Sequence, residues 1–213
     1  MSFVMHYKNY SVSLKTILIT FGLGTLILQK AVALPIYDED FQQLKPANTL
    51  EDKNARDRAE QVRRVTQYIQ ETFRVAPHKT IAIITEAVYN GHKHDLQPEL
   101  ILAIIAVEST FRENAVSHAG ARGLMQILPR AHPKKVKAIG GIEALFHMKR
   151  NIAAGSAILN EYLKRSQGDL RKALLRYNGS LSDPTFKYSR KVLKIFDKLK
   201  KVIALSRECS ELW

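Results

Sequence analysis

The sequence is poor in cysteine, and this limits what can hold the fold together. Its 213 residues include one cysteine, Cys209, the fifth residue from the end. One cysteine cannot close an internal disulfide, so a domain of this size has to depend on an apolar core. No cysteine lies near residue 33, where one could have carried a lipid. We expect Cys209 to be an incidental tail residue, with pairing between two chains as the alternative.

Acidic residues are also scarce, with 20 Asp and Glu against 33 Lys and Arg and a formal charge of +13. Such a charge favours anionic partners, whether nucleic acid, phospholipid or an acidic cell envelope. No nucleic-acid recognition motif accompanies it, so we expect no nucleic-acid partner. Segment 188–205 is basic and amphipathic. Its charged face is expected either to hold the protein near an anionic envelope surface or only to keep it soluble.

The chain has no apolar run of membrane-spanning length near its start. The uncharged stretch 16–28 is long enough for the apolar region of a signal peptide but short for a membrane span. Lys8 and Lys15 precede it, and Ala-Val-Ala at 31–33 follows as a cleavage site. We therefore predict a cleaved signal peptide over 1–33 and export to the periplasm or cell envelope, with an uncleaved membrane anchor as the alternative. The mature chain would keep a charge of +10.

Metal-ligand patterns are missing as well. His92 and His94 are two positions apart and do not share a helix face, and no histidine is accompanied by a cysteine or a second ordered ligand set. We predict that the protein uses no metal ion and no cofactor.

No segment alternates apolar and polar residues with the period of two that strands require, so the chain is predicted to be mainly α-helical. Residues 34–49 are expected to be an extended lead-in. Asn90-Gly91 is predicted to end the second helix, and Pro98 to open a third that is apolar on every side. Glycines over 118–130 indicate a turn or a small hairpin. Helices are predicted over 50–73, 78–92, from Pro98 through the apolar run, and over 151–165, 169–177 and 188–205.

Glu108 stands at the end of the apolar run that begins at Leu100. Burial disfavours the charged form of a carboxyl group and raises its pKa, so such a residue can serve as a general acid near neutral pH. The alternative is a helix-terminal acid that turns to solvent.

Several motifs occur around Glu108 in a specific order. "ESTF" precedes "NAVSHAGARGLMQILP", and "NIAAGSAIL", "ALLRYNGS" and "YSRKVL" follow over roughly 80–195. Together they resemble bacterial lytic transglycosylases of the soluble (SLT) type. The resemblance implies a lysozyme-like (α+β) single catalytic domain. We place this domain at 79–205, after an N-terminal extension with a charged helix at 34–78 and before a tail at 206–213.

The resemblance also implies cleavage of the β-1,4 bond between N-acetylmuramic acid and N-acetylglucosamine in peptidoglycan, with a 1,6-anhydro product. Glu108 would act first as the acid and then as the base, and Tyr177 and Asn178 would face it from the opposite wall. Met125 and Gln126 would touch the sugar. The residues that the resemblance places at the substrate are Ser109, Gly123, Leu124, Met125, Gln126, Tyr177 and Asn178.

Two features leave room for other functions. The usual Ala-Tyr-Asn-Ala-Gly motif reads Arg-Tyr-Asn-Gly-Ser at 176–180, so the floor of the cleft differs. Asp183 could hold a water molecule, as in a hydrolase similar to goose-type lysozymes. A further alternative is an envelope protein that assists assembly of a secretion system or pilus by local wall remodelling, with an assembly partner bound through 50–75 or the basic C-terminal segment.

Overall fold

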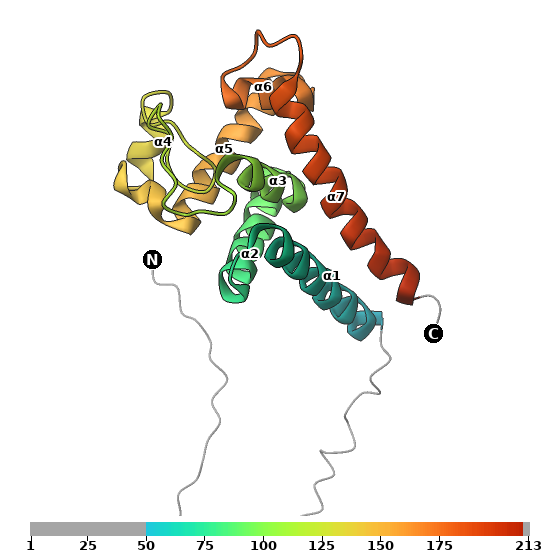
Figure 1. Ribbon diagram of the computed structural model, residues 1–213. Helices are drawn as coiled ribbons and strands as arrows, with labels where there is room; N and C mark the ends of the chain where they lie inside the picture. Colours follow the sequence, from blue (N-terminus) through green and yellow to red (C-terminus); the bar gives the residue numbers. More distant parts are fainter. Residues whose placement is uncertain (1–49, 211–213) are drawn as a thin grey trace, which may run out of the picture. The chain divides into compact units, whose positions relative to one another are not determined.

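The computed structural model describes residues 50–210, with side-chain environments up to residue 204, and the described residues form helices joined mostly by short loops, with a long irregular connection over 110–132 (Figure 1). The predicted signal peptide and the lead-in at 34–49 lie outside the described residues. In chain order the elements are α1 (Leu50–Phe73), α2 (Pro77–His94), α3 (Pro98–Ser109), α4 (Pro133–Ala138), the short 3₁₀ helix η2 (Glu143–Phe146), α5 (Met148–Arg165), α6 (Leu170–Asn178) and α7 (Lys187–Ser210).

Helix α3 supplies the centre of the core. Every residue from Leu100 to Ala106 is buried, as expected for a helix that is apolar on all sides. α2 and α7 both pack against it. Because α3 is held on several sides, the residue at its C-terminal end has a fixed position, and that residue is Glu108.

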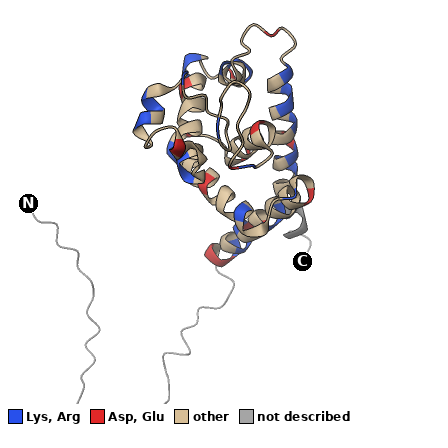
Figure 2. Cartoon of the chain, turned by 60° about the vertical axis from the view of Figure 1, so that its left-hand side comes forward, with Lys and Arg blue, Asp and Glu red and all other residues tan. Residues whose placement is uncertain are grey.

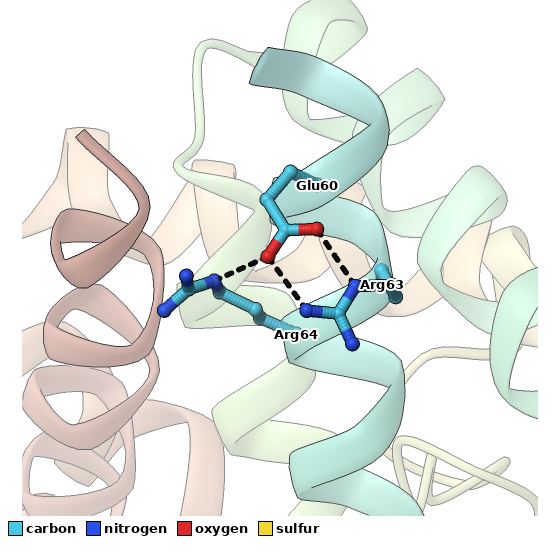
Figure 3. A network of polar contacts seen from close by, with 3 residues as sticks. All are labelled: Glu60, Arg63 and Arg64. Atoms are coloured by element: carbon cyan, nitrogen blue, oxygen red, sulfur yellow. Dashed lines mark hydrogen bonds and ion pairs between the residues drawn. The ribbon is translucent and has the colours of Figure 1, made fainter. Parts of the chain in front are cut away.

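Helix α1 packs against α2 and α7 through a narrow apolar face, as its spacing predicts. Val65 and Ile69 are buried in the same core as α3, whereas Val62 remains 37% exposed. Its solvent face carries a small charge network, in which the Glu60 carboxylate accepts bonds from Arg63 and Arg64 (Figure 3). These two guanidinium groups lower the pKa of Glu60 to about 2. The helix of the predicted N-terminal extension therefore shares one hydrophobic core with α3.

The predicted end of α2 is wrong. The helix continues through Asn90 and Gly91 to His94, and Asp95 takes the left-handed conformation at its C-cap. A Cβ atom on Gly91 would lie 2.7 Å from the carbonyl oxygen of Leu96. Gly91 therefore allows the returning chain to approach the helix and does not terminate it.

Helix α7 confirms its amphipathic prediction. Val192, Phe196 and Leu199 are buried, and Ile195, Val202 and Ile203 are partly buried against the same core. The charged face is exposed and runs along the helix (Figure 2).

No strand forms between residues 50 and 210, so the mainly α prediction is confirmed. The predicted turn region contains two isolated bridges, Val116 with Arg122 and Arg122 with Ile127. These bridges fold residues 116–127 back toward the C-terminal end of α3.

Candidate active site

Glu108 lies in the last turn of α3, directly before the helix ends. Thr110 adopts a left-handed conformation (φ 50°) and its N–H bonds to the carbonyl of Ala106, which closes the helix. Glu108 is partly buried, and its side chain borders two adjoining hollows. It therefore combines an apolar setting on the core side with access from solvent.

Among the described residues, the hydrogen-bond partner of the Glu108 carboxylate is Tyr188, from the first turn of α7. The Tyr188 hydroxyl donates a hydrogen bond of 2.6 Å to Glu108 Oε1, across 80 residues of sequence. Burial raises the pKa of Glu108 to about 7, and the bond from Tyr188 opposes part of that rise. A carboxyl group with this pKa is protonated in a large fraction of molecules near neutral pH, and can donate a proton there.

The first hollow lies beside the C-terminal end of α1. It has a volume of about 850 Å³ and is lined by Phe73, Arg74, Glu108, Arg112 and Glu113, among others. We call it the α1-side hollow. Residues 73–76 belong to the segment predicted as an extension, and here they form part of its wall.

The second hollow lies beside α6 and has a volume of about 360 Å³. We call it the α6-side hollow. Tyr177, Asn178, Arg176, Tyr162 and His132 are among its lining residues. Both hollows share Glu108, Ser117 and Gln126. Together they form a cleft with Glu108 at its middle, a shape suited to a chain that extends on both sides of the carboxyl.

The loop at 122–126 reaches the cleft through Gln126, which lines both hollows, whereas residues 123–125 are buried beneath it. Gly123 has a φ of 77°, and a Cβ atom there would collide with the Asn151 side chain. Gln126 has a φ of 47°, and its amide Nε2 donates to the carbonyls of Ala115 (3.0 Å) and Gly123 (2.9 Å). The Gln126 amide therefore has two backbone partners, and both bonds hold the loop.

Three other residues predicted at the substrate lie beneath the surface. The Ser109 hydroxyl donates to the carbonyl of Ile105, so its described bond is not to Glu108. Leu124 and Met125 are fully buried, and the Met125 side chain packs against Gly155. In this structure the Leu124 and Met125 side chains fill the core under the cleft.

Tyr177 and Asn178 both line the α6-side hollow, which Glu108 lines as well. The Tyr177 hydroxyl donates to the Met125 carbonyl at 2.9 Å, and Asn178 Nδ2 donates to Ser180 Oγ at 3.1 Å. Tyr177 thus ties α6 to the 122–126 loop. The tyrosine that bonds to the Glu108 carboxyl is Tyr188.

Two residues of the site were not singled out from the sequence. Tyr188 opens "YSRKVL" and Asn151 opens "NIAAGSAIL", so both stand in quoted motifs. Asn151 is buried and accepts from Met125 N–H (2.8 Å) while donating to the carbonyls of Arg122 (3.0 Å) and Leu145 (2.8 Å). The motifs marked these positions, but only the fold shows which groups they contact.

Asp183, the acid that could hold water in a hydrolase, instead caps the start of α7. Its carboxylate accepts bonds from Thr185 N–H (2.8 Å), the Thr185 hydroxyl (2.7 Å) and Lys187 N–H (3.1 Å). These bonds, led by that from the Thr185 hydroxyl, lower the pKa of Asp183. Asp183 is not among the residues that line either hollow. Among residues 50–204, no three histidine, cysteine or acidic side chains gather closely enough to hold a metal ion.

Comparison with known proteins identifies the segment that supplies most of this cleft. Residues 87–192, from the middle of α2 to the second turn of α7, match the family model described as transglycosylase SLT domain. The chain carries a domain of the transglycosylase SLT family. The matched range contains Glu108, Tyr188, Asn151 and the 122–126 loop.

Relatives of this SLT protein include a transglycosylase of Enterobacteria phage PRD1, 34% identical over 107 residues, which are 48% of this chain and 38% of that protein. The membrane-bound lytic murein transglycosylase C of Salmonella typhi is 32% identical over 145 residues, which are 61% of this chain and 37% of that protein. The chain thus covers well under half the length of these two relatives.

A solved structure supports the fold described above. Lytic transglycosylase Slt from Pseudomonas aeruginosa, determined as an inactive mutant, is 22% identical with a TM-score of 0.51, and the match covers 55% of this chain and 24% of that one. Among the described helices, none is both long enough and apolar enough to cross a membrane.

Proposed function

We propose that this protein is a peptidoglycan lytic transglycosylase. It cleaves the β-1,4 bond between N-acetylmuramic acid and N-acetylglucosamine and forms a 1,6-anhydro-muramic end. The observation that carries the proposal is the Glu108 carboxyl, which lies in the middle of the cleft with its pKa raised to about 7. The names of the relatives, which are transglycosylases and murein transglycosylases, support the substrate class.

The mechanism needs one carboxyl group. Ordinary glycosidases use two, but substrate-assisted enzymes replace the second with the substrate's own N-acetyl oxygen. Glu108 donates its proton to the glycosidic oxygen as the bond breaks, and the N-acetyl oxygen stabilises the anomeric carbon. The Glu108 carboxylate then takes the proton of the sugar's C6 hydroxyl, whose oxygen bonds to the anomeric carbon and closes the anhydro ring. No metal ion or cofactor enters these steps.

The arrangement of acids favours this mechanism over a two-carboxylate hydrolase. Among the described residues that line the cleft, the acids are Glu108 and Glu113. Glu113 is 3.5 Å from the Lys79 ammonium group, and Asp183 caps α7. Neither shares the apolar setting of Glu108.

The other residues predicted at the substrate take roles that fit their positions. Gln126 and Asn178 border the cleft with side-chain amides, and Gly123 lets the loop pack closely against Asn151 and the Leu145 carbonyl beneath it. Leu124 and Met125 support this wall from below, Ser109 holds the end of α3, and Tyr177 holds the loop against α6. Tyr188 stabilises the Glu108 carboxylate that forms after proton donation.

We also propose that the protein acts in the periplasm or cell envelope, where its substrate is found. The names of relatives that are membrane-bound murein enzymes support this location. The basic face of α7 would hold the enzyme near anionic envelope surfaces, and local cleavage of this kind would suit a role beside an envelope assembly.

Mass spectrometry of products from purified wall tests the activity. We expect wild-type protein to release 1,6-anhydro-muropeptides, and Glu108→Gln to bind wall but lose at least about 10²-fold in rate, because general acid catalysis is worth about 10²–10⁴-fold. Glu99→Gln, on the same helix but outside the cleft, is the matched control. Reducing muropeptide ends would instead identify a hydrolase, and a Glu108→Gln protein with a tenth of wild-type activity would remove Glu108 from the mechanism.

A further inference from the structure

The α6-side hollow is lined by few charged residues. Among the described residues that line it, Glu108 is the only acid, and Arg176 is the only Lys or Arg. His132 also lines it, but burial, aided by the charge of Lys135, lowers the pKa of His132 and favours its neutral form. A ligand in this hollow therefore meets one permanent positive charge, opposite a carboxyl that is neutral in its proton-donating state.

Arg176 is held in a defined orientation. It lies in the last turn of α6, is partly buried, and its Nε donates to Ser166 Oγ at 3.2 Å. Ser166 is itself buried, so one edge of the guanidinium group is fixed. None of the ion pairs among the described residues involves Arg176. Its two terminal amino groups are thus left without a carboxylate.

A partly buried guanidinium group without a carboxylate costs solvation energy that a bound anion can recover. The terminal amino groups of arginine form a planar fork that matches a carboxylate in two parallel bonds. Tyr162, from α5, lines the same hollow and provides an aromatic wall. The site thus suits a carboxylate carried on a bulkier group.

Arg176 is also the position at which the sequence motif breaks, since alanine usually precedes the Tyr-Asn pair. The adjacent Tyr177 holds the loop through the Met125 carbonyl, so the side chain before it is not needed for that contact. The larger, charged residue therefore adds a group to the cleft without replacing a structural one.

We propose that Arg176 is a specificity residue that binds a carboxylate of the peptidoglycan strand next to the cleaved bond. The inference rests on the proposed function, because it assumes that the cleft holds a glycan strand. Two parts of a strand can supply the carboxylate, namely the stem peptide, or the lactyl group of a muramic acid from which the peptide has been removed. The enzyme would therefore prefer strands with free carboxylates over strands whose carboxylates are blocked.

The test compares three substrates made from one wall preparation. The first keeps its stem peptides, the second is stripped of peptides so that lactyl carboxylates are free, and the third keeps peptides whose carboxylates are amidated. The full chain is assayed as wild type, Arg176→Gln and Arg176→Lys, with kcat and KM measured separately. Arg171→Gln, at an exposed position on the same helix, is the matched control.

For wild type, we expect KM on the amidated substrate to exceed KM on the better of the two free-carboxylate substrates about tenfold, which is the lower bound for losing a hydrogen bond to a charged group. Arg176→Gln should raise KM on the free-carboxylate substrate by a similar factor and abolish the effect of amidation, whereas Arg171→Gln should keep it. Arg176→Lys should restore part of the preference. A lower KM on the peptide-bearing than on the stripped substrate assigns the carboxylate to the peptide. A lower KM on the stripped substrate assigns it to the lactyl group, whose carboxylate is free only after the peptide is removed, and equal KM on both means that either carboxylate binds.

Equal KM on all three substrates in the wild type would overturn the inference while leaving the proposed function intact. Absence of cleavage on all three substrates would overturn the proposed function itself. If Arg176→Gln fails to fold, the wild-type comparison of free and amidated strands still decides, because it changes the substrate alone.

Discussion

The raised pKa of Glu108 links the chemistry of this residue to the stability of the fold. In the unfolded chain a glutamate loses its proton near pH 4.5, whereas in the folded protein Glu108 keeps it until about pH 7. Between these values the folded state binds more protons than the unfolded state, so the free energy of unfolding falls as the pH rises. Below pH 4.5 both states are protonated, and above pH 7 both are ionised.

We therefore expect Glu108→Gln to have a higher free energy of unfolding than wild type, and we expect this gain to be larger at pH 8 than at pH 4.5. The neutral amide avoids the cost of an ionised group in an apolar setting, and the gain should grow by about 2–3 kcal/mol across this range, with part of the shift discounted for solvent access. Chemical denaturation of wild type and variant at several pH values measures it. Glu99→Gln should show no such trend, and a gain for Glu108→Gln that is constant with pH would contradict a perturbed carboxyl.

The hydroxyl of Tyr188 predicts a second effect at this site. Its bond lowers the pKa of Glu108, so Tyr188→Phe should raise that pKa further and move the alkaline fall in kcat to higher pH. The maximal rate should drop by roughly 10–100-fold, because a hydrogen bond to a charged group contributes about 1.5–3 kcal/mol. A pH–rate profile separates the two effects. The control Tyr89→Phe, at an exposed tyrosine of α2, should leave the pH–rate profile unchanged. An unchanged profile for Tyr188→Phe would mean that Tyr188 only fills space.

Among the elements, α5 fixes the wall of the cleft through Asn151. Asn151→Ala would leave one N–H and two carbonyl groups of the chain without their partner, and each buried unsatisfied group costs about 1–3 kcal/mol. We expect the free energy of unfolding to fall by about 3 kcal/mol or more, measured in denaturant. Asn160→Ala, on the same helix, removes one bond to the His94 carbonyl and should cost about 1 kcal/mol. Equal losses would show that the three bonds of Asn151 do not act together.

The elements also show where sequence reasoning succeeds and where it stops. Apolar periodicity predicted α1 with its observed bounds and the buried character of α3, because both depend on the local pattern. The end of α2 was misplaced, because Gly91 is selected by the approach of Leu96, a contact that no local pattern encodes. At the site, the apolar run marked Glu108, but the pairing with Tyr188 joins residues 80 positions apart and needed the fold.

At the scale of the whole molecule, positive charge gathers along one helix. Between Lys187 and Lys201, Asp197 is the one acid, and the exposed cations recur at three- and four-residue steps that place them on one side of α7 (Figure 2). These cations are Lys187, Arg190, Lys191, Lys194, Lys198 and Lys201, and Lys200 is exposed as well. The opposite side of α7 is packed against α1 and α3, so the helix cannot turn this charge inward.

A continuous basic face attracts anionic surfaces over a distance set by salt, with a Debye length of about 8 Å at physiological ionic strength. We expect the triple change of Lys194, Lys198 and Lys201 to Gln to weaken binding to intact wall at low salt, and the difference from wild type to vanish at high salt. Cleavage of a short neutral glycan should not change, because these residues lie outside the cleft. Binding is measured by co-sedimentation with wall at a series of salt concentrations.

The triple change of Lys134, Lys137 and Lys164 to Gln removes the same charge elsewhere and should have a smaller effect. Equal losses in both triples would mean that net charge alone acts, and a salt-independent affinity shared with wild type would reduce the α7 lysines to a role in solubility.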